Sequence, residues 1–183
     1  MLSGRRPIVP KRSGWPVRAI VLLAALALAP AAEAGDALTA LGDALQIALP
    51  LAAATCAARQ HRLGGYAAGF TAQTAVTQGL KYGLGDSPLN TRPNGVSHGF
   101  PSGHTAAAAS GATDLAAHCA PGNRLVAAGA AAAVALVGAS RMAAEEHTFA
   151  QVLAGAAIGA LSTGVRLYET PGGGIGLAYS IPF

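Results

Sequence analysis

The sequence has little charge and few aromatic residues: 11% of its 183 residues are charged and 5% are aromatic. So little charge, together with 52% hydrophobic residues, excludes a disordered chain and points to membrane helices or deeply buried helices. Basic patches interleaved with aromatic residues are absent, so we expect no nucleic-acid partner. The formal net charge of +4 does not change this, because five of the twelve basic residues fall in the first eighteen positions.

Cysteine is scarce as well. Cys56 and Cys119 have no metal-binding or redox spacing, and both lie inside apolar runs. We therefore expect two small, buried side chains rather than a bridge. A disulfide would need an oxidising compartment, and the topology expected below places both cysteines at cytoplasmic helix ends.

The apolar residues are mostly alanine, the best helix former and a poor strand former, which predicts an all-α fold. Apolar segments recur between polar breaks, and each is close to the length that spans a bilayer core. Small residues let such helices approach closely, and the charged face of a soluble bundle is missing. We predict one bundle of five or six transmembrane helices, with an exported soluble bundle as the alternative. The segments are residues 37–58, 64–84, 102–120, 125–140 and 147–167.

The first 34 residues have the features of a targeting segment. Basic residues precede an apolar run that ends in the A-x-A pattern of residues 32–34, which predicts a signal peptide or a first transmembrane helix. The chain after Gly35 then begins outside the cytoplasm. The predicted domain covers residues 35–168, and a glycine-rich tail covers residues 169–183. The tail alternates apolar residues as a strand does, but a single strand makes no barrel, so we expect a disordered or interfacial tail.

If successive apolar segments cross the membrane in alternate directions, three cations lie outside the cytoplasm, against the positive-inside rule. They are Lys81, Arg92 and Arg141, on the same side as His104 and His147. Cations that break this rule are candidates for function. Arginine presents a planar fork of donors and lysine a point charge, while histidine can act as nucleophile or general acid. The group therefore indicates an oxyanion site, with phosphate as the obvious ligand.

The stretch "FPSGHT" opens a helix beside these residues. Proline is favoured in the first helical turn, and Ser102 can cap the helix. Gly103 lets backbone N–H groups approach an anion at the positive end of the helix dipole. The sequence thus predicts a helix N-terminus aimed at the same site.

Three blocks in order resemble the type 2 phosphatidic acid phosphatase (PAP2) and vanadium haloperoxidase superfamily. They are Arg92-Pro93, "PSGH" at residues 101–104, and "SRMAAEEH" at residues 140–147. The family pattern is K-x6-R-P, then P-S-G-H, then S-R-x5-H-x3-D. The second block matches throughout, and the third matches as far as its histidine. The resemblance covers residues 80–164. This part of the sequence looks like the short bacterial membrane-associated members of the family.

The resemblance implies a role for each residue. His147 would attack phosphorus and form a phosphohistidine, and His104 would protonate the leaving oxygen. No metal and no other cofactor would be needed, because cations stabilise the charge, and water would then hydrolyse the intermediate. The phosphoryl oxygens would be held by Lys81, Arg92, Arg141, the Ser102 hydroxyl and the Gly103 N–H.

The sequence departs from the family pattern at two points. Ten residues rather than six separate Lys81 from Arg92, within a polar loop where added length costs little. Gln151 stands where the family has the aspartate that orients the nucleophilic histidine. Two further readings follow. One is a degenerate member that binds phosphorylated lipid with little turnover, for which Gln151→Asp would raise activity; the other is vanadate-dependent halide oxidation in the same pocket.

Several remaining polar residues have simpler interpretations. We expect His61 and His118 to face solvent, and we attribute His98 to the polarity of its loop. Asp114 lies in the middle of an apolar helix and calls for a partner. Glu145 and Glu146 are expected to face away from His147. The residues expected to satisfy helix–helix hydrogen bonds are Asp43 and Gln46.

The sequence therefore predicts a metal-independent phosphatase that acts on a lipid phosphate or diphosphate. Its partners would be a phosphorylated lipid and the membrane. The expected location is the bacterial inner membrane with the site facing the periplasm, or the periplasm after signal cleavage. Phosphatidate, phosphatidylglycerophosphate, undecaprenyl diphosphate and lipid A phosphates all carry the required group.

Overall fold

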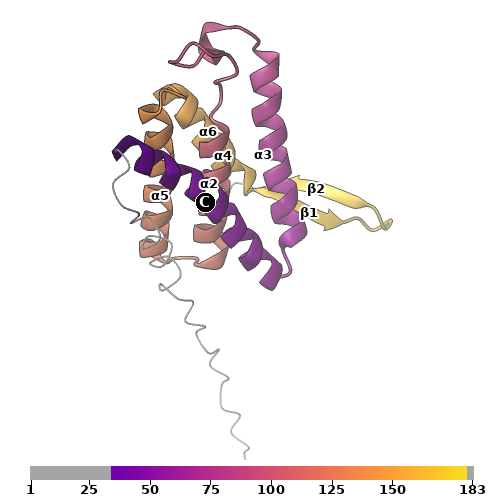
Figure 1. Cartoon of the computed structure of the whole chain (residues 1–183). Helices are drawn as coiled ribbons and strands as arrows, with labels where there is room; N and C mark the ends of the chain where they lie inside the picture. Colours follow the sequence, from indigo (N-terminus) through magenta and orange to yellow (C-terminus); the bar gives the residue numbers. More distant parts are fainter. Residues whose placement is uncertain (1–33, 181–183) are drawn as a thin grey trace, which may run out of the picture. The chain divides into compact units, whose positions relative to one another are not determined.

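The computed structural model describes residues 34–180, so the predicted targeting segment lies almost wholly outside the described residues. Helices form nearly all of the regular structure in this part, which confirms the predicted helical bundle (Figure 1). A short 3-10 turn, Pro88–Asn90, lies in the polar loop, and a π-helical turn, Leu115–Cys119, extends α4. The other elements are α2 (Ala34–Arg59), α3 (Leu63–Gly83), α4 (Gly103–Asp114), α5 (Arg124–Ala143), α6 (Phe149–Ser162), β1 (Val165–Glu169) and β2 (Ile175–Tyr179).

Side-chain caps fix where these helices begin. The Asn123 side chain accepts hydrogen bonds from the backbone N–H groups of Leu125 and Val126 at the start of α5. Thr148 caps α6 in a reciprocal capping box with Gln151. The last apolar segment, predicted to run from residue 147 to 167, is shorter as a helix and ends at Ser162. The chain then turns into a strand.

Helix α4 lies at the centre of the bundle, between α3 and α5 in Figure 1, and also contacts α2 and α6. Most of its residues are small and buried, including Ala106, Ala108, Ala109 and Ala112. Small side chains let four neighbours approach one helix. The first turn of α4 is therefore packed among its neighbours, close to the ends of α3 and α5.

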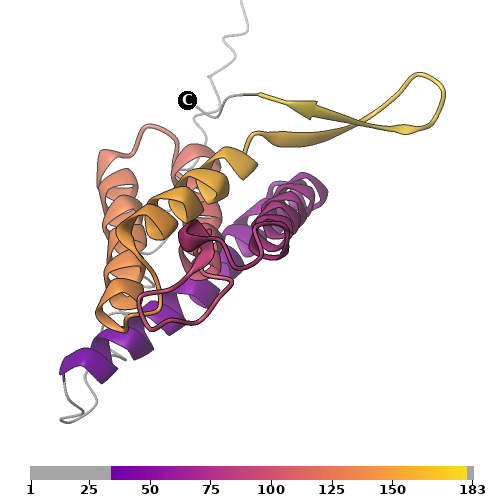
Figure 2. The ribbon, with the colours of Figure 1, turned by 90° about the horizontal axis from the view of Figure 1, so that it is seen from above.

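Two glycines four residues apart on α6 allow that helix to lie directly on α4. A Cβ atom at Gly155 would collide with the carbonyl oxygen of Ser102, and one at Gly159 with that of Ala106. Figure 2 shows α6 running from the α5 side of the bundle toward the hairpin. The contact places the start of α6, next to His147, beside the start of α4.

Replacing Gly159 with alanine should therefore destabilise the fold, although alanine has the higher helix propensity. Overpacking of a helix contact by one methyl group lowers the free energy of unfolding by about 1–3 kcal/mol. Gly129→Ala is the matched control, because this α5 glycine is exposed and has no atom near its absent Cβ. Thermal unfolding should show a lower melting temperature for Gly159→Ala and an unchanged or higher one for Gly129→Ala. Equal melting temperatures would contradict the proposed packing.

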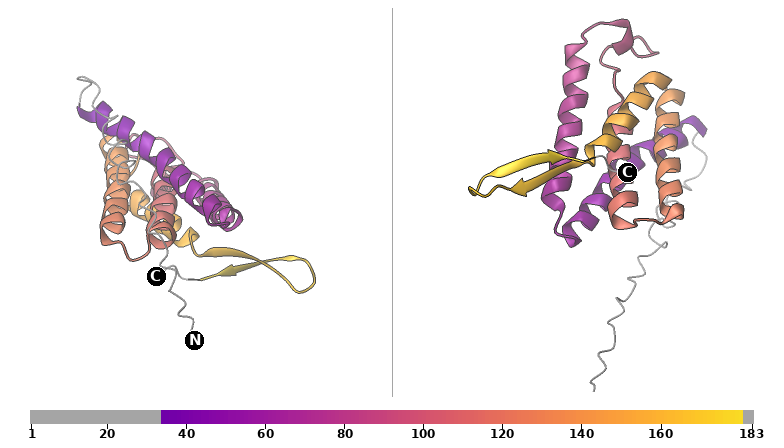
Figure 3. Two further views of the ribbon diagram at one scale, coloured as in Figure 1. Left: turned by 90° about the horizontal axis from the view of Figure 1, so that it is seen from below. Right: turned by 180° about the vertical axis from the view of Figure 1, so that it is seen from behind.

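The glycine-rich tail differs from the disordered or interfacial segment expected from the sequence. Its apolar alternation forms β2, which pairs antiparallel with β1 from Val165↔Tyr179 to Glu169↔Ile175. The hairpin extends away from the helices (Figure 3). The expectation of disorder was wrong because it considered a strand only as part of a barrel, whereas residues just after α6 supply a local partner.

Within residues 34–180, two helices are long and apolar enough to cross a membrane, at residues 35–59 and 124–143. Helix α6 is apolar but has only 14 residues. The exposed large apolar side chains include Ile47 and Leu51 on α2 and Phe149 and Leu153 on α6. Apolar surface therefore covers the outer faces of several helices.

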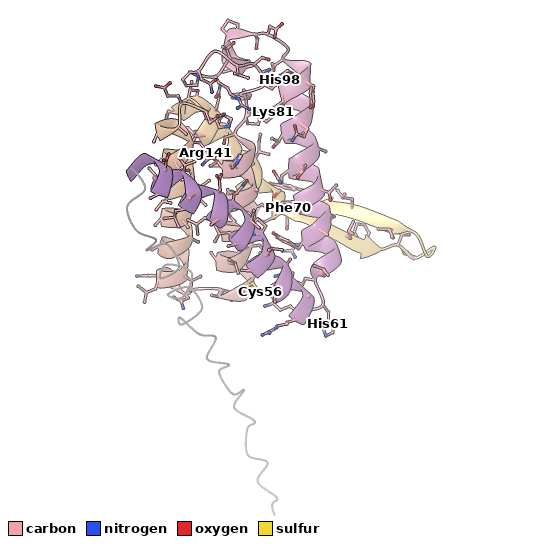
Figure 4. The ribbon with its side chains drawn as sticks, viewed as in Figure 1. Cys56, His61, Phe70, Lys81, His98 and Arg141 are labelled. Atoms are coloured by element: carbon pink, nitrogen blue, oxygen red, sulfur yellow. A yellow bond between two sulfur atoms is a disulfide. The ribbon has the colours of Figure 1, made fainter. Side chains whose placement is uncertain are left out.

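Cys56 and Cys119 form a disulfide, so the expectation of two separate buried thiols was wrong. Packing against α4 brings the end of α2 to the π-helical turn that carries Cys119. Figure 4 shows Cys56 and His61 at one end of the helices and Lys81, His98 and Arg141 toward the other. The disulfide and the predicted site thus lie at opposite ends.

Candidate phosphate-binding active site

One cavity of about 630 Å³ brings together almost all the predicted site residues. It lies where the last turns of α3 and α5 meet the first turn of α4. Gly103 and His104 enter from α4, and the connection between α5 and α6 supplies His147. The three cations on its wall are Lys81, Arg92 and Arg141.

Among the residues predicted to hold the phosphoryl oxygens, Ser102 differs in its placement. It is fully buried outside the cavity lining, and its hydroxyl caps α4 by accepting from the Thr105 N–H. Gly103, the first residue of α4, does line the cavity. The first backbone N–H groups of a helix have no partner within it, so the positive end of α4 is available to an anion.

The long spacing between Lys81 and Arg92 is accommodated by a buried asparagine that sequence reasoning missed. Asn90 is fully buried, and its amide donates to the carbonyl oxygens of Lys81 at 2.8 Å and Gly85 at 2.6 Å. Its side-chain oxygen accepts from the Phe100 N–H at 2.9 Å. Asn90 thus ties the loop between the two cations to the segment that leads into α4. An asparagine after a proline in a long polar loop was the only signal in the sequence.

Each cation has a protein partner at the cavity. Lys81 donates to the His98 carbonyl oxygen at 2.7 Å, which gives the loop residue His98 a positioning role through its backbone. Arg92 pairs with Glu146, which lines the cavity rather than facing away from the site. Because Glu146 pairs with Arg92 on the cavity wall, a phosphate would have to compete with this carboxylate for the guanidinium group.

Arg141 is held by α2 as well as by its own helix. It donates to the Thr39 carbonyl oxygen at 3.1 Å and pairs with Asp43 at 3.0 Å. Asp43 also lies 3.4 Å from Nε2 of His104. We expected Asp43 to satisfy a helix–helix hydrogen bond, and its position beside two site residues is evident only in three dimensions.

His147 is oriented by Gln151, the residue that replaces the family's aspartate. Nδ1 of His147 lies 3.2 Å from Oε1 of Gln151, which also accepts from the Thr148 N–H at 3.1 Å. Nε2 of Gln151 donates to the carbonyl oxygens of Leu89 at 3.0 Å and Thr91 at 2.9 Å. The Gln151 side chain is only 1% exposed.

This network fixes the tautomer of the histidine. The Gln151 amide cannot turn over, because its nitrogen would then face the Thr148 N–H and its oxygen would face two carbonyl oxygens. Oε1 therefore stays toward His147 and accepts a proton carried on Nδ1. The other ring nitrogen, Nε2, keeps its lone pair and is chemically able to act as a nucleophile.

Burial and neighbouring charges set the protonation of the site. Burial, aided by Lys81 and Arg92, lowers the pKa of His147 to about 4 despite the Gln151 hydrogen bond, so the imidazole is neutral at pH 7. Burial and Arg92 lower the pKa of Lys81 to about 8, which leaves the ammonium mostly charged at pH 7. A neutral nucleophile beside a cationic wall suits attack on a phosphate anion.

A second polar cluster lies at the disulfide end and involves Asp114. Arg62 pairs with both carboxylate oxygens of Asp114 at 3.1 Å, which supplies the partner expected for a buried acid. His118 is mostly buried and lies 3.3 Å from the same carboxylate, so the expectation that it faces solvent was wrong. His61 is exposed, as predicted. The Cys56–Cys119 disulfide lies next to this cluster, away from the phosphate site.

Within a helical bundle, the site combines a neutral histidine, three cations and a helix N-terminus on the wall of one cavity. Within residues 34–180, no group of three or more metal-ligating side chains could hold a metal ion. The chain belongs to the PAP2 superfamily, whose family model matches residues 18–171. Membership in this superfamily supports a phosphatase-type function for the chain. Neither the curated proteins nor the solved structures include a significant match to it.

Proposed function

We propose that the protein is a metal-independent phosphatase that removes a phosphate from a lipid phosphate or diphosphate through a phosphohistidine. The observation that carries this proposal is the neutral His147 imidazole, held through Nδ1 by Gln151, on the wall of a cationic cavity. Nε2 of His147 would attack phosphorus as the bond to the leaving oxygen breaks. His104 would supply the proton that the leaving oxygen needs.

The cavity supports charge stabilisation without a metal ion. Lys81, Arg92 and Arg141 would hold the phosphoryl oxygens, with the Gly103 N–H at the α4 dipole end. Phosphoryl transfer depends mainly on such positioning and charge stabilisation. Water would then attack the phosphohistidine and release phosphate. His104, now neutral, would accept the proton of that water.

The Gln151 network favours an active enzyme over the degenerate alternative. In serine proteases, exchanging the orienting acid for an amide lowers turnover by about 10⁴, because the amide selects the wrong histidine tautomer. Here the two carbonyl oxygens of Leu89 and Thr91 hold the amide in the orientation that accepts from Nδ1. Gln151 therefore provides the orienting hydrogen bond of an aspartate and lacks only its charge.

Apolar surface near the site favours a lipid as the carrier of the phosphate. Phe70 and Ala107 line the same cavity as the cations, and apolar side chains on α2 and α6 are exposed. A phosphorylated lipid could place its headgroup in the cavity and its chains along this surface. Phosphatidate, phosphatidylglycerophosphate, undecaprenyl diphosphate and lipid A phosphates are the candidates.

The disulfide indicates on which side of the membrane the domain lies. If the bundle crossed the membrane with its site in the periplasm, Cys56 and Cys119 would face the reducing cytoplasm, where disulfides are rare. We propose that the whole domain after residue 34 is exported and meets the membrane from the periplasmic side. In intact cells, the two thiols should react with a maleimide reagent only after reduction. Labelling without a reductant would place the disulfide end in the cytoplasm.

Phosphate release from purified protein tests the proposed activity. The protein in detergent should release inorganic phosphate from at least one of the candidate lipids, with unchanged rates in the presence of EDTA. Loss of activity on chelation would contradict a metal-independent reaction. Binding of the lipids without release would favour the degenerate alternative, and oxidation of bromide by hydrogen peroxide in the presence of vanadate would favour a haloperoxidase.

The depressed pKa of Lys81 predicts how substrate binding depends on pH. Above pH 8 the ammonium loses its proton, so KM should rise by about tenfold between pH 7 and pH 9 as the charged fraction falls. Lys81→Arg is the matched variant, because a guanidinium stays charged over this range. Its KM should remain nearly constant. A rise of the same size in both proteins would assign the effect to another group.

A further inference from the structure

Asp43 of α2 pairs with His104, the second histidine of the site. Oδ1 of Asp43 lies 3.4 Å from Nε2 of His104 and 3.0 Å from the Arg141 guanidinium. Both side chains line the cavity, whereas Asp43 does not. The carboxylate therefore approaches the two residues from outside the space that a phosphate would occupy.

The packing of α2 brings the carboxylate to this position. Gly42 lies against the end of α5, where a Cβ atom would collide with the Ser140 hydroxyl oxygen. This close approach sets the next residue, Asp43, beside Arg141. The Thr39 carbonyl oxygen, one turn earlier on α2, accepts from the same guanidinium at 3.1 Å. Two groups of α2 thus hold Arg141, and one of them also reaches His104.

We propose that Asp43 is a positioning residue that orients His104 as the general acid. With Nε2–H directed at the carboxylate, the proton on Nδ1 is the one that a leaving group in the cavity can receive. This inference rests on the proposed phosphatase function. The two histidines then have different partners: an amide for the nucleophile His147 and a carboxylate for the acid His104.

The proton balance follows from this arrangement. His147 Nε2 forms the bond to phosphorus, the bond to the leaving oxygen breaks, and the Nδ1 proton of His104 passes to that oxygen. His104 is left neutral, with its remaining proton on Nε2 facing Asp43. In the second step Nδ1 takes a proton from water, whose oxygen displaces His147 from phosphorus.

Four charged groups act on His104 from the elements around it. Asp43 of α2 and Glu146 of the α5–α6 connection favour its protonated form, while Arg141 of α5 and Lys81 of α3 disfavour it. Burial is the largest influence and lowers the pKa of His104. Asparagine at position 43 would remove one of the two opposing acids, so the pKa should fall further.

The Asp43→Asn variant separates acid positioning from phosphate anchoring. A general acid matters most for a poor leaving group. The variant should therefore lose about tenfold in kcat/KM on an alkyl phosphate and less than about threefold on p-nitrophenyl phosphate. The basic limb of its kcat/KM profile should move about one unit toward lower pH. Asp43→Glu should restore part of the loss.

Asp36→Asn is the matched control, since it makes the same charge change in the first turn of α2 at an exposed position. Asp36→Asn should leave kcat/KM on both substrates, and its pH profile, unchanged. Equal losses on both substrates without a shift of the basic limb would overturn the proposal and leave Asp43 as an anchor for Arg141.

An NMR titration of the His104 ring tests the pairing without turnover. Its pKa should be about one unit lower in Asp43→Asn than in the unaltered protein. An unchanged pKa would overturn the inference. If the unaltered protein released no phosphate from any substrate, the proposed function would fail, and this titration would still decide whether Asp43 acts on His104.

Discussion

Alanine in place of His147 should abolish phosphate release, with a loss of about 10⁴-fold or more in kcat. The imidazole is the proposed nucleophile, and Gln151 orients it on the wall of the cavity. Substrate binding should change much less, because the cations and the α4 N-terminus remain. The expected signature is therefore a collapse of kcat with a nearly constant KM.

A trapping experiment identifies the nucleophile directly. Rapid denaturation during turnover of a ³²P-labelled substrate should leave label on the protein that is stable in alkali and labile in acid, as a phosphohistidine is. The label should be absent from His147→Ala and present in His61→Ala, which alters an exposed histidine at the opposite end of the helices. Residual turnover near the original rate in His147→Ala would disprove the mechanism.

Replacing Gln151 with an acidic residue should have the second largest effect. It should lower the stability of the fold and should not raise kcat. Glutamate at this position would remove two donors and set a buried carboxylate against the carbonyl oxygens of Leu89 and Thr91. Unpaired groups of this kind should lower the free energy of unfolding by about 2–4 kcal/mol. Aspartate would restore the family residue but would also lose both donated hydrogen bonds.

Thermal unfolding and phosphate release together test this prediction. The melting temperature should fall by about 6–12 °C in Gln151→Glu, and kcat should not rise in either acid variant. Gln78→Glu is the control for stability, because Gln78 is exposed on α3. A sharp rise of kcat in Gln151→Asp would instead support the degenerate reading, in which the missing charge limits the reaction.

Local signals accounted for the helices and for the identity of most site residues. Alanine-rich segments predicted the helical bundle, because alanine favours the helix wherever packing allows it. Spacing and motif order singled out Lys81, Arg92, Gly103, His104 and His147, and the structure places them around one cavity. The same approach identified Arg141, which follows Ser140 and precedes His147 in the third motif.

Partners from distant segments could not be read from the chain. Asp43 lies on α2, far in sequence from His104 and Arg141, and only the close packing at Gly42 brings it to them. The same holds for Cys56 and Cys119, which seemed to be separate small residues and form a disulfide. In each case the contact depends on how the helices pack, which cannot be predicted from a single sequence.

Local patterns in the chain are enough to identify the chemical groups of the site: two histidines, three cations and a helix start that can face an anion. The role of Gln151, in contrast, depends on the folded chain. Its amide meets Leu89 and Thr91, about sixty residues earlier in the chain, and their carbonyl oxygens fix which end of the amide His147 sees. A departure from the family motif is therefore compatible with the orienting role, because hydrogen-bond geometry rather than charge sets the tautomer.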